Sequence, residues 1–109
     1  MKAIKLSGAD TVATLLGDVQ KHEIVEIISA ENEVIAEIKA LQAITFGNKI
    51  SLCDIEQGVQ IYKGGHSIGK SITLIPFGQL VHVQNVRSER LDIPESVIQE
   101  IIKQMGIEQ

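Results

Sequence analysis

The sequence predicts a mainly β domain that ends in one amphipathic helix, and three observations support this prediction. Apolar residues make up 44% of the 109 residues, and most of them are isoleucine, valine and leucine. Abundant β-branched side chains favour strands. A Phe-Gly segment followed by an alternating stretch occurs twice, at residues 44–52 and 75–83. The third observation is the helical spacing of apolar residues in the segment 92–109.

The length of 109 residues suits one domain with one core. We expect a β domain over residues 1–91, and a helix over residues 92–109 that packs on the same domain or on a partner. The net charge of −4, without a basic block, argues against nucleic-acid binding. No apolar run is long enough for a membrane helix, and the single Cys53 fits a reducing cytoplasm.

The first part of the chain is predicted to be strand, short helix and hairpin. Residues 2–6 alternate as a strand does. Asp10 precedes "TVATLLGDV", where it could cap a helix of one or two turns that Gly17 ends. Residues 22–41 fit two strands joined by a turn at "AENE", and we prefer this hairpin to the alternative of one long helix.

The second part is built on the repeat. "ITFGNKISL" and "IPFGQLVHV" share the pattern Ile-x-Phe-Gly-x-x-apolar-x-apolar, which predicts two halves of a small β fold related by a pseudo-two-fold axis. Between them "VQIYK" reads as a strand that ends at the Gly64-Gly65 corner. Cys53 alternates with apolar neighbours, so we expect a buried thiol. Pro94 and Gly106 delimit the predicted C-terminal helix.

The stretch "GGHSIGKS" at residues 64–71 matches the letters of a phosphate-binding P-loop. Such a loop must lead into a helix whose N-terminus faces the phosphates. The residues that follow are β-branched, include Pro76 and belong to the second repeat. We therefore interpret Gly64, Gly65 and Gly69 as turn residues and not as a nucleotide site.

Three ordered motifs give the chain a family resemblance. "GNKISLCDIEQG", "YKGGHSIGKS" and "IPFGQLVHVQNV" resemble the SAF-type domain of altronate and galactarate dehydratases, and the small subunit of sulfolactate sulfo-lyase. The resemblance is strong over residues 44–86 and weaker before them. It implies a β-clip fold, which agrees with the repeat.

The resemblance also implies a function and a partner. It points to a lyase that removes water, or sulfite, from a polyhydroxy or sulfonated acid. A large separate domain or chain would carry most of the chemistry and any divalent metal. A free-standing small domain then resembles a subunit that works with a large catalytic subunit and holds no cofactor of its own. A homo-oligomer is a second form of assembly that stays open.

What the resemblance implies for single residues depends on which positions of this chain keep the family pattern. The positions that keep the family pattern are Lys49, Asp54, Gly58, Lys63, Gly65, Ile68, Gly69, Val81, His82, Val83 and Asn85. Asn48 and Gln84 stand where histidine is usual, and Gly64 stands where tyrosine is usual. An amide forms hydrogen bonds but does not exchange protons near neutral pH. Acid–base or metal-binding roles of those histidines therefore do not transfer.

Five residues are candidates for substrate binding: Lys49, His82, Asn85, Asn48 and Gln84. His82 and Gln84 are two apart in an expected strand and would project from one face. That face could meet a substrate or a partner, or it could simply be solvated. Lys49 is the best candidate for a carboxylate contact, and an ordinary surface lysine is the alternative. The sequence identifies no catalytic residue, and neither His22 nor His66 has neighbours at metal-ligand spacing.

These observations lead to two functional hypotheses. The first is the small subunit of a sugar-acid dehydratase-like lyase, of the altronate or galactarate type, that lines or covers an active site on a large subunit. The second is a non-catalytic module that binds a sugar acid or assembles proteins.

Overall fold

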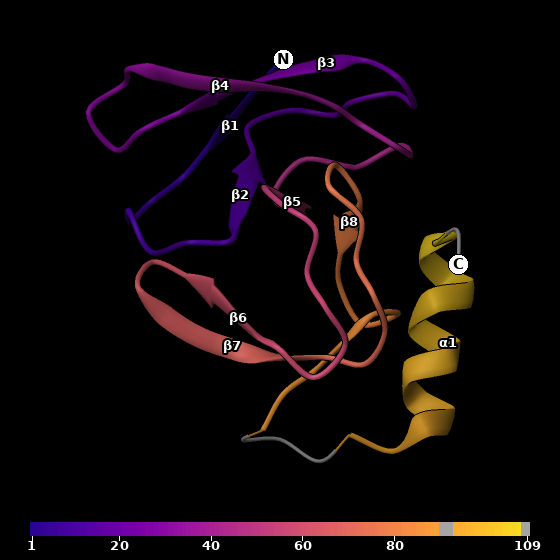
Figure 1. The fold of residues 1–109 in the computed structure, drawn as a ribbon. Helices are drawn as coiled ribbons and strands as arrows, with labels where there is room; N and C mark the ends of the chain where they lie inside the picture. The colour runs from indigo at the N-terminus through magenta and orange to yellow at the C-terminus, as the bar shows by residue number, and fades with distance from the viewer. Residues whose placement is uncertain (90–92, 108–109) are drawn as a thin grey trace.

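The computed structural model describes residues 1–89 and 93–107, which form two sheets and one helix (Figure 1). The elements are β1 (Lys2–Ile4), β2 (Val12–Leu15), β3 (Ile24–Ile28), β4 (Val34–Lys39), β5 (Lys49–Ser51), β6 (Gln60–Lys63), β7 (His66–Ser71), β8 (Leu80–Val81), β9 (Val86–Arg87) and α1 (Glu95–Met105). The fold is mainly β, as predicted, and it agrees with the expected β-clip architecture.

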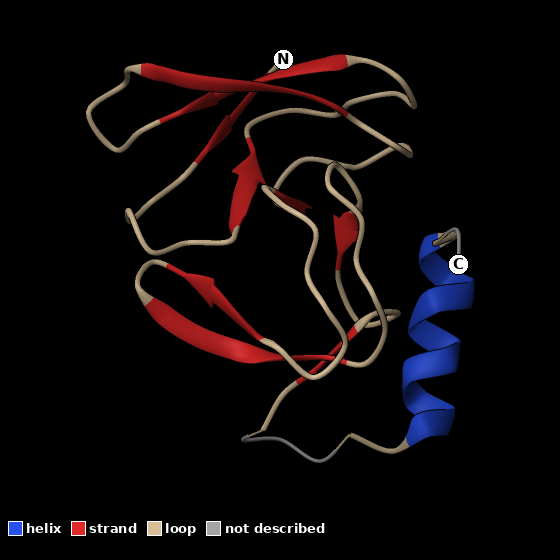
Figure 2. Cartoon of the chain, in the orientation of Figure 1, coloured by secondary structure: helices blue, strands red, loops and turns tan. Residues whose placement is uncertain are grey.

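The strands pair in two separate sheets. The larger sheet has the order β4-β3-β1-β2-β5-β8, and the smaller sheet has the order β6-β7-β9. Only β1 and β3 pair in parallel; the other pairs are antiparallel. Figure 2 shows how short the strands are relative to the loops and turns that connect them.

Strands β2, β5 and β8 lie between two hydrophobic clusters. Ala13, Leu15 and Ile50 belong to the cluster under β1 and β3. Val12 and Val81 point the other way and pack with Ile61 and other residues near the smaller sheet. Lys49 is directly opposite Val81 in the sheet, so its side chain shares the second face. This pairing directs a lysine towards the space between the two sheets.

An eight-residue turn unit occurs four times in the chain. The units are residues 15–22, 40–47, 51–58 and 71–78, and each leaves a strand or its end, bends and enters a turn. The fifth residue of each unit forms an isolated bridge, which pairs Val19 with Ile44 and Ile55 with Ile75. The eighth residue has a positive φ in the three units that end in glycine and also in the one that ends in His22.

The four units interlock as two pairs with matching hydrogen bonds. The N–H of each eighth residue donates to the carbonyl oxygen of the partner's first residue, and these bonds are His22 to Ala40, Gly47 to Leu15, Gly58 to Ser71 and Gly78 to Ser51. The carboxylates also match: Asp18 accepts from the Phe46 N–H and Asp54 from the Phe77 N–H, both at 2.8 Å. The predicted pseudo-two-fold is therefore present, and each half contains two copies of the unit.

The predicted short helix after Asp10 is wrong. Residues 12–15 form strand β2, which pairs with β1 on one side and β5 on the other. Val12, Ala13 and Leu15 are almost fully buried on two opposite faces, which a strand allows and one amphipathic helix turn does not. Asp10 does cap backbone N–H groups, but these belong to two turns and not to a helix.

The preferred hairpin over residues 22–41 is confirmed. Strands β3 and β4 pair in antiparallel register from Ile24–Lys39 to Ile28–Val34. The turn between them holds Asn32 at φ 64°, a conformation that asparagine tolerates better than most residues. The hydroxyl of Ser29 accepts hydrogen bonds from the N–H groups of Glu31 and Glu33.

The expectation of a buried thiol is wrong, because Cys53 is exposed. Strand β5 ends at Ser51, so Cys53 lies in the bend of a turn unit, where strand alternation no longer applies.

Helix α1 begins after Pro94 and ends at Gly106, whose φ is 65°. Ile98 and Ile102 are buried, at 2% and 5% exposure, and Ile107 packs on the cluster that contains Ala13. Val97 and Met105 of the predicted apolar stripe are both 45% exposed. The expected boundary between residues 91 and 92 lies outside the described residues. Among those residues, no helix combines the length and apolar character needed to cross a membrane.

Replacing Gly78 with alanine should destabilise the fold more than the same change at Gly47. Both residues have positive φ, 88° and 83°, but a Cβ on Gly78 would lie 2.5 Å from the Lys39 carbonyl oxygen whereas one on Gly47 meets nothing. We expect a loss of about 3 kcal/mol in unfolding free energy for Gly78→Ala and about 1 kcal/mol for Gly47→Ala. Urea unfolding followed by circular dichroism measures both, and equal losses would contradict the close approach.

Candidate functional site

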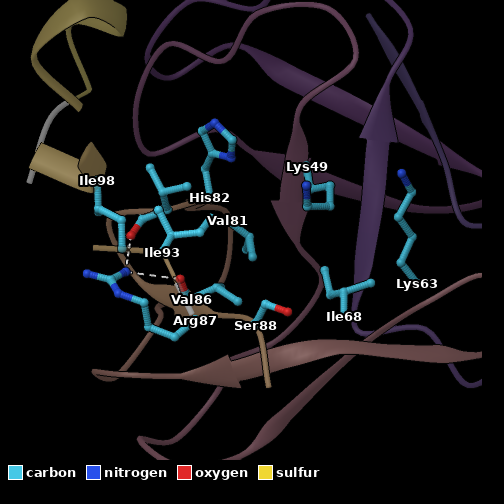
Figure 3. A pocket seen from close by; sticks show the side chains of 11 residues that line it. Lys49, Lys63, Ile68, Val81, His82, Val86, Arg87, Ser88, Ile93 and Ile98 are labelled. Atoms are coloured by element: carbon cyan, nitrogen blue, oxygen red, sulfur yellow. Dashed lines mark hydrogen bonds between the residues drawn. The ribbon is translucent and has the colours of Figure 1, made fainter. Parts of the chain in front are cut away.

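A pocket of about 220 Å³ lies where β5, β6, β7, the end of β8 and α1 meet (Figure 3). Lys49, Lys63, His82 and Arg87 are the basic residues that line it, and none of its described lining residues carries a carboxylate. We refer to it as the cationic pocket. Two of the five predicted substrate-binding residues, Lys49 and His82, contribute to it.

Lys49 comes from the first position of β5, between Thr14 on β2 and Val81 on β8. Its side chain is half-buried, and in the part of the chain that the structure describes it forms no ion pair. Burial lowers the pKa of the Lys49 ammonium below 10.5, and the positive charge of Lys63 lowers it further. An ammonium in this situation gains free energy from a bound anion, because an anion replaces both the lost solvation and the missing counter-charge.

His82 follows β8 at the edge of the same pocket. Burial lowers the pKa of its imidazole below 6.5, and the charge of Lys49 lowers it further. The ring is therefore neutral at pH 7, with one nitrogen that donates a hydrogen bond and one that accepts. His82 can then orient a hydroxyl or accept a proton, while Lys49 supplies the charge.

Arg87 is the basic residue whose hydrogen bonds are already satisfied. Its guanidinium donates to the carbonyl oxygens of Val83 and Val86 and to the Glu95 carboxylate, at 3.1 and 3.3 Å for the two carboxylate oxygens. It thereby ties the turn after β8 to the first turn of α1. In the described lining of the pocket, the positive charges without an ion pair are those of Lys49 and Lys63.

The sequence analysis noted Lys63 only as a position that keeps the family pattern. The signal that could have identified it is that Lys63 lies in the second family motif, as Lys49 lies in the first.

Asn85 faces away from the pocket and holds a turn together. It is 2% exposed, its side-chain oxygen accepts from the His82 N–H at 3.0 Å, and its side-chain nitrogen donates to the Leu80 carbonyl oxygen at 2.8 Å. Its visible contribution to the site is to position His82.

The two amides that replace the family's usual histidines also lie outside the cationic pocket. Asn48 lines a smaller hollow near Met105 and Gly106, and its side-chain nitrogen donates to the Thr45 hydroxyl at 2.7 Å. The Gln84 side-chain nitrogen donates back to the Leu80 carbonyl oxygen at 2.9 Å.

The prediction that His82 and Gln84 project from one face of a strand is wrong. Strand β8 ends at Val81, and residues 82–85 form a turn in which the N–H groups of Asn85 and Val86 both donate to the His82 carbonyl oxygen. The buried Asn85 amide competes with strand pairing here by bonding to the backbone around it. The turn separates His82, which lines the pocket, from Gln84, which does not.

The rejection of a P-loop at residues 64–71 is confirmed, but the interpretation of Gly69 as a turn residue is wrong, because Gly69 lies within strand β7 opposite Ile61. Gly64 and Gly65 have φ of 61° and 82° and form the two-residue turn between β6 and β7, and β7 then continues to Ser71 as a strand. The N–H groups of both glycines donate to the Asp10 carboxylate, at 2.7 and 2.8 Å, and not to a phosphate. The sequence therefore matches the letters of the motif without its strand-to-helix geometry.

The described residues do not fit a metal ion. Nowhere in residues 1–89 and 93–107 do three side chains of histidine, cysteine, aspartate or glutamate gather as a set of metal ligands. The described lining of the cationic pocket offers the chemistry of two lysine ammonium groups and an imidazole.

The pKa of His82 should depend on Lys49. Lys49→Met removes the neighbouring charge but keeps most of the side-chain volume, so we expect the His82 pKa to rise yet to remain below 6.5, because burial persists. NMR titration of the imidazole protons measures this. Lys70, which pairs with Glu89 at 3.7 Å outside the pocket, gives the control variant Lys70→Met, which should leave the His82 pKa unchanged. A His82 pKa that does not respond to Lys49→Met would contradict the proximity of the two groups.

Comparison with known proteins assigns the family. The family described as "Altronate/galactarate dehydratase SAF domain" matches residues 1–89. The chain is 30% identical over 95 residues to an altronate dehydratase of Escherichia coli (strain K12), covering 87% of this chain and 18% of that protein. It is 33% identical over 90 residues to an altronate dehydratase of Bacillus subtilis (strain 168), covering 83% of this chain and 17% of that protein. The chain thus spans less than a fifth of the length of these relatives, and the comparison reaches no further than their SAF region. It belongs to the family of altronate/galactarate dehydratase SAF domains.

Proposed function

We propose that this chain is the small subunit of a sugar-acid dehydratase-like lyase and that it lines or covers an active site on a separate catalytic polypeptide. The family and the length comparison support the proposal, since the matched relatives carry more than four-fifths of their length outside this domain. The catalytic polypeptide would correspond to that remainder. A cytoplasmic location is part of the proposal, and the exposed thiol of Cys53 suits a reducing compartment.

The observation that carries the proposal is the pair of ammonium groups, Lys49 and Lys63, that line the cationic pocket and form no ion pair among the described residues. Dehydration of a hydroxy acid removes a proton next to the carboxylate, and negative charge grows on the carboxylate oxygens as that proton leaves. Lys49, half-buried and next to Lys63, would bind the carboxylate and stabilise the growing charge. Such groups act more strongly in a water-poor site than on an open surface, so a partner that covers the pocket would strengthen them.

Proton transfer, unlike carboxylate binding, is assigned mainly to the catalytic polypeptide. Within the described lining of the pocket, His82 is the one imidazole, and burial and the charge of Lys49 lower its pKa and so weaken it as a base. Asn48 and Gln84 are amides and lie elsewhere. We therefore assign the principal acid–base groups, and any divalent metal, to the catalytic polypeptide.

The second candidate is a module that binds the acid or assembles proteins without turnover. The amides at positions 48 and 84 favour it, because they replace the usual histidines by groups that cannot transfer protons. This module would bind an acid through the same lysines and would not change the rate of a catalytic partner.

The test combines this chain with a candidate catalytic polypeptide that resembles the remainder of the altronate dehydratases, and follows dehydration of altronate and galactarate. We expect the two chains to form a complex in size-exclusion chromatography, and the rate of dehydration to depend on the presence of this chain. A complex without any effect on the rate supports the assembly module. Full activity of the catalytic polypeptide alone, with no complex, overturns the subunit proposal.

A further inference from the structure

The cationic pocket has two chemically different parts. Lys49 and Lys63 supply free positive charge in its described lining, and aliphatic side chains lie among and beside them (Figure 3). Val81 and Ile98 are almost fully buried, at 0% and 2% exposure, so the aliphatic surface open to a ligand comes from Ile68, Val86 and Ile93. A ligand that fills the pocket must therefore present both a negative group and an apolar surface.

Part of the apolar wall comes from outside the region that defines the family. The family match ends at residue 89, whereas Ile93 and Ile98 follow it and line the pocket from the C-terminal segment. Arg87 and Glu95 hold this segment in place through their bidentate ion pair. In this chain the C-terminal segment thus adds an aliphatic side to a site whose charges lie within the matched region.

The wall offers little to the hydroxyl groups of a sugar acid. Among the described lining residues, Ser88 provides the one side-chain hydroxyl, and it lies in the exposed segment after β9. A hydroxyl that enters an apolar site without a hydrogen-bond partner costs about 1–3 kcal/mol, and a sugar acid carries several of them. His82 can orient one hydroxyl, but the aliphatic part of the lining matches an apolar body better than the polyhydroxy body of a sugar acid.

We propose that the cationic pocket binds a small carboxylate with a compact, branched apolar body, of the kind represented by 3-methylbutanoate. The carboxylate pairs with Lys49 and Lys63, and the branched hydrocarbon packs on Ile68, Val86 and Ile93, the more exposed aliphatic side chains of the lining. A cavity of about 220 Å³ suits a ligand smaller than drug-sized molecules, whose pockets begin at about 300 Å³. This binding goes beyond the proposed lyase function, because it needs no catalytic partner and no turnover.

The experiment titrates the isolated full chain with 3-methylbutanoate and follows backbone amide shifts by NMR. Matched probes are 3-methylbutanamide, which keeps the shape without the charge, and gluconate, which keeps the charge with a polyhydroxy body. We expect 3-methylbutanoate to bind about tenfold or more tightly than either probe, since each loses about 1.4 kcal/mol or more from charge pairing or from hydroxyl desolvation. The shifted amides should lie around Lys49, His82 and Ile98.

Two pairs of variants test the contacts. Lys49→Met should weaken binding of 3-methylbutanoate about tenfold, whereas Lys70→Met, at an exposed lysine outside the pocket, should leave it unchanged. Ile93→Ala should weaken binding several-fold, whereas Val97→Ala, at a similarly exposed position outside the pocket, should not. Thermal unfolding of each variant shows whether the fold is intact.

Several results would overturn the inference: gluconate that binds as tightly as 3-methylbutanoate, binding that ignores Lys49→Met, or no binding of 3-methylbutanoate at all. The proposed function has its own, separate test, which is the effect of this chain on the rate of a catalytic partner. Conversely, if no catalytic partner responds to this chain but 3-methylbutanoate binds as expected, the lyase proposal fails and the carboxylate site stands.

Discussion

Asp10→Ala should lower the free energy of unfolding by about 4 kcal/mol, the largest effect on stability that we expect from a single side chain in this domain. The Asp10 carboxylate is 5% exposed and accepts three backbone hydrogen bonds, from Ser7 at 3.0 Å, Gly64 at 2.7 Å and Gly65 at 2.8 Å. Alanine would leave all three N–H groups without a charged acceptor. Urea unfolding at pH 7 measures the loss.

The effect of Asp10 should also depend on pH. Burial by itself would raise the pKa of the carboxyl, but the hydrogen bonds from Gly65, Gly64 and Ser7 outweigh it and hold the pKa below 3.8. A carboxyl with a lowered pKa stabilises the fold above its unfolded pKa, and this contribution disappears as the pH falls through the folded pKa. The stability difference between the wild type and Asp10→Asn should therefore be full at pH 6 and shrink below about pH 4. A difference that is constant from pH 7 to pH 2 would show that shape, and not charge, is what the turn needs.

In the lyase complex that we propose, Lys49→Met should lower kcat/KM for the acid about 100-fold. Removing a charge-assisted contact from a partly buried site costs about 1.5–3 kcal/mol, and 2.7 kcal/mol corresponds to that factor. Because the carboxylate gains negative charge during dehydration, we expect kcat to fall as well as KM to rise. Steady-state kinetics with altronate and galactarate measure both parameters.

Controls separate this effect from misfolding and from general electrostatics. Lys49→Arg keeps the charge and should retain part of the activity, although its planar guanidinium differs in shape from the ammonium. Lys70→Met also removes one lysine charge, but at an exposed residue that pairs with Glu89, and it should have no effect on kcat/KM. A loss that is equal for Lys49→Met and Lys70→Met would argue against a specific carboxylate contact.

The sequence allowed much of the fold to be predicted, because the relevant signals are local. The β3–β4 hairpin, the strand before Gly64-Gly65 and helix α1 all follow from periodicity and turn residues. Two of the four turn units were visible because they contain the letters Phe-Gly. The other two end in Lys21-His22 and Gln57-Gly58, and they repeat the backbone path without repeating its letters.

What the sequence did not predict depends on contacts between distant residues. Asp10 is followed by a helix-like pattern, and only the Gly64-Gly65 turn, more than fifty residues later, shows what its carboxylate binds. The same holds for the site: Lys49 and His82 could be proposed singly, but their meeting with Lys63 depends on both sheets. Asn85 was proposed as a substrate ligand because it keeps the family pattern and follows His82 by three residues, whereas its burial, which leaves 2% of it exposed, is a tertiary property.

We propose that the carboxylate of the acid substrate lies against the Lys49 ammonium, and the pKa of Lys49 is the most direct measure of this contact. In the free chain this pKa lies below 10.5. NMR titration of the side-chain amine, with the chain assembled on its catalytic partner, should show a rise in the Lys49 pKa when galactarate saturates the site, because a nearby negative charge favours the protonated form. An unchanged Lys49 pKa in the saturated complex would contradict the claim and would place the carboxylate elsewhere.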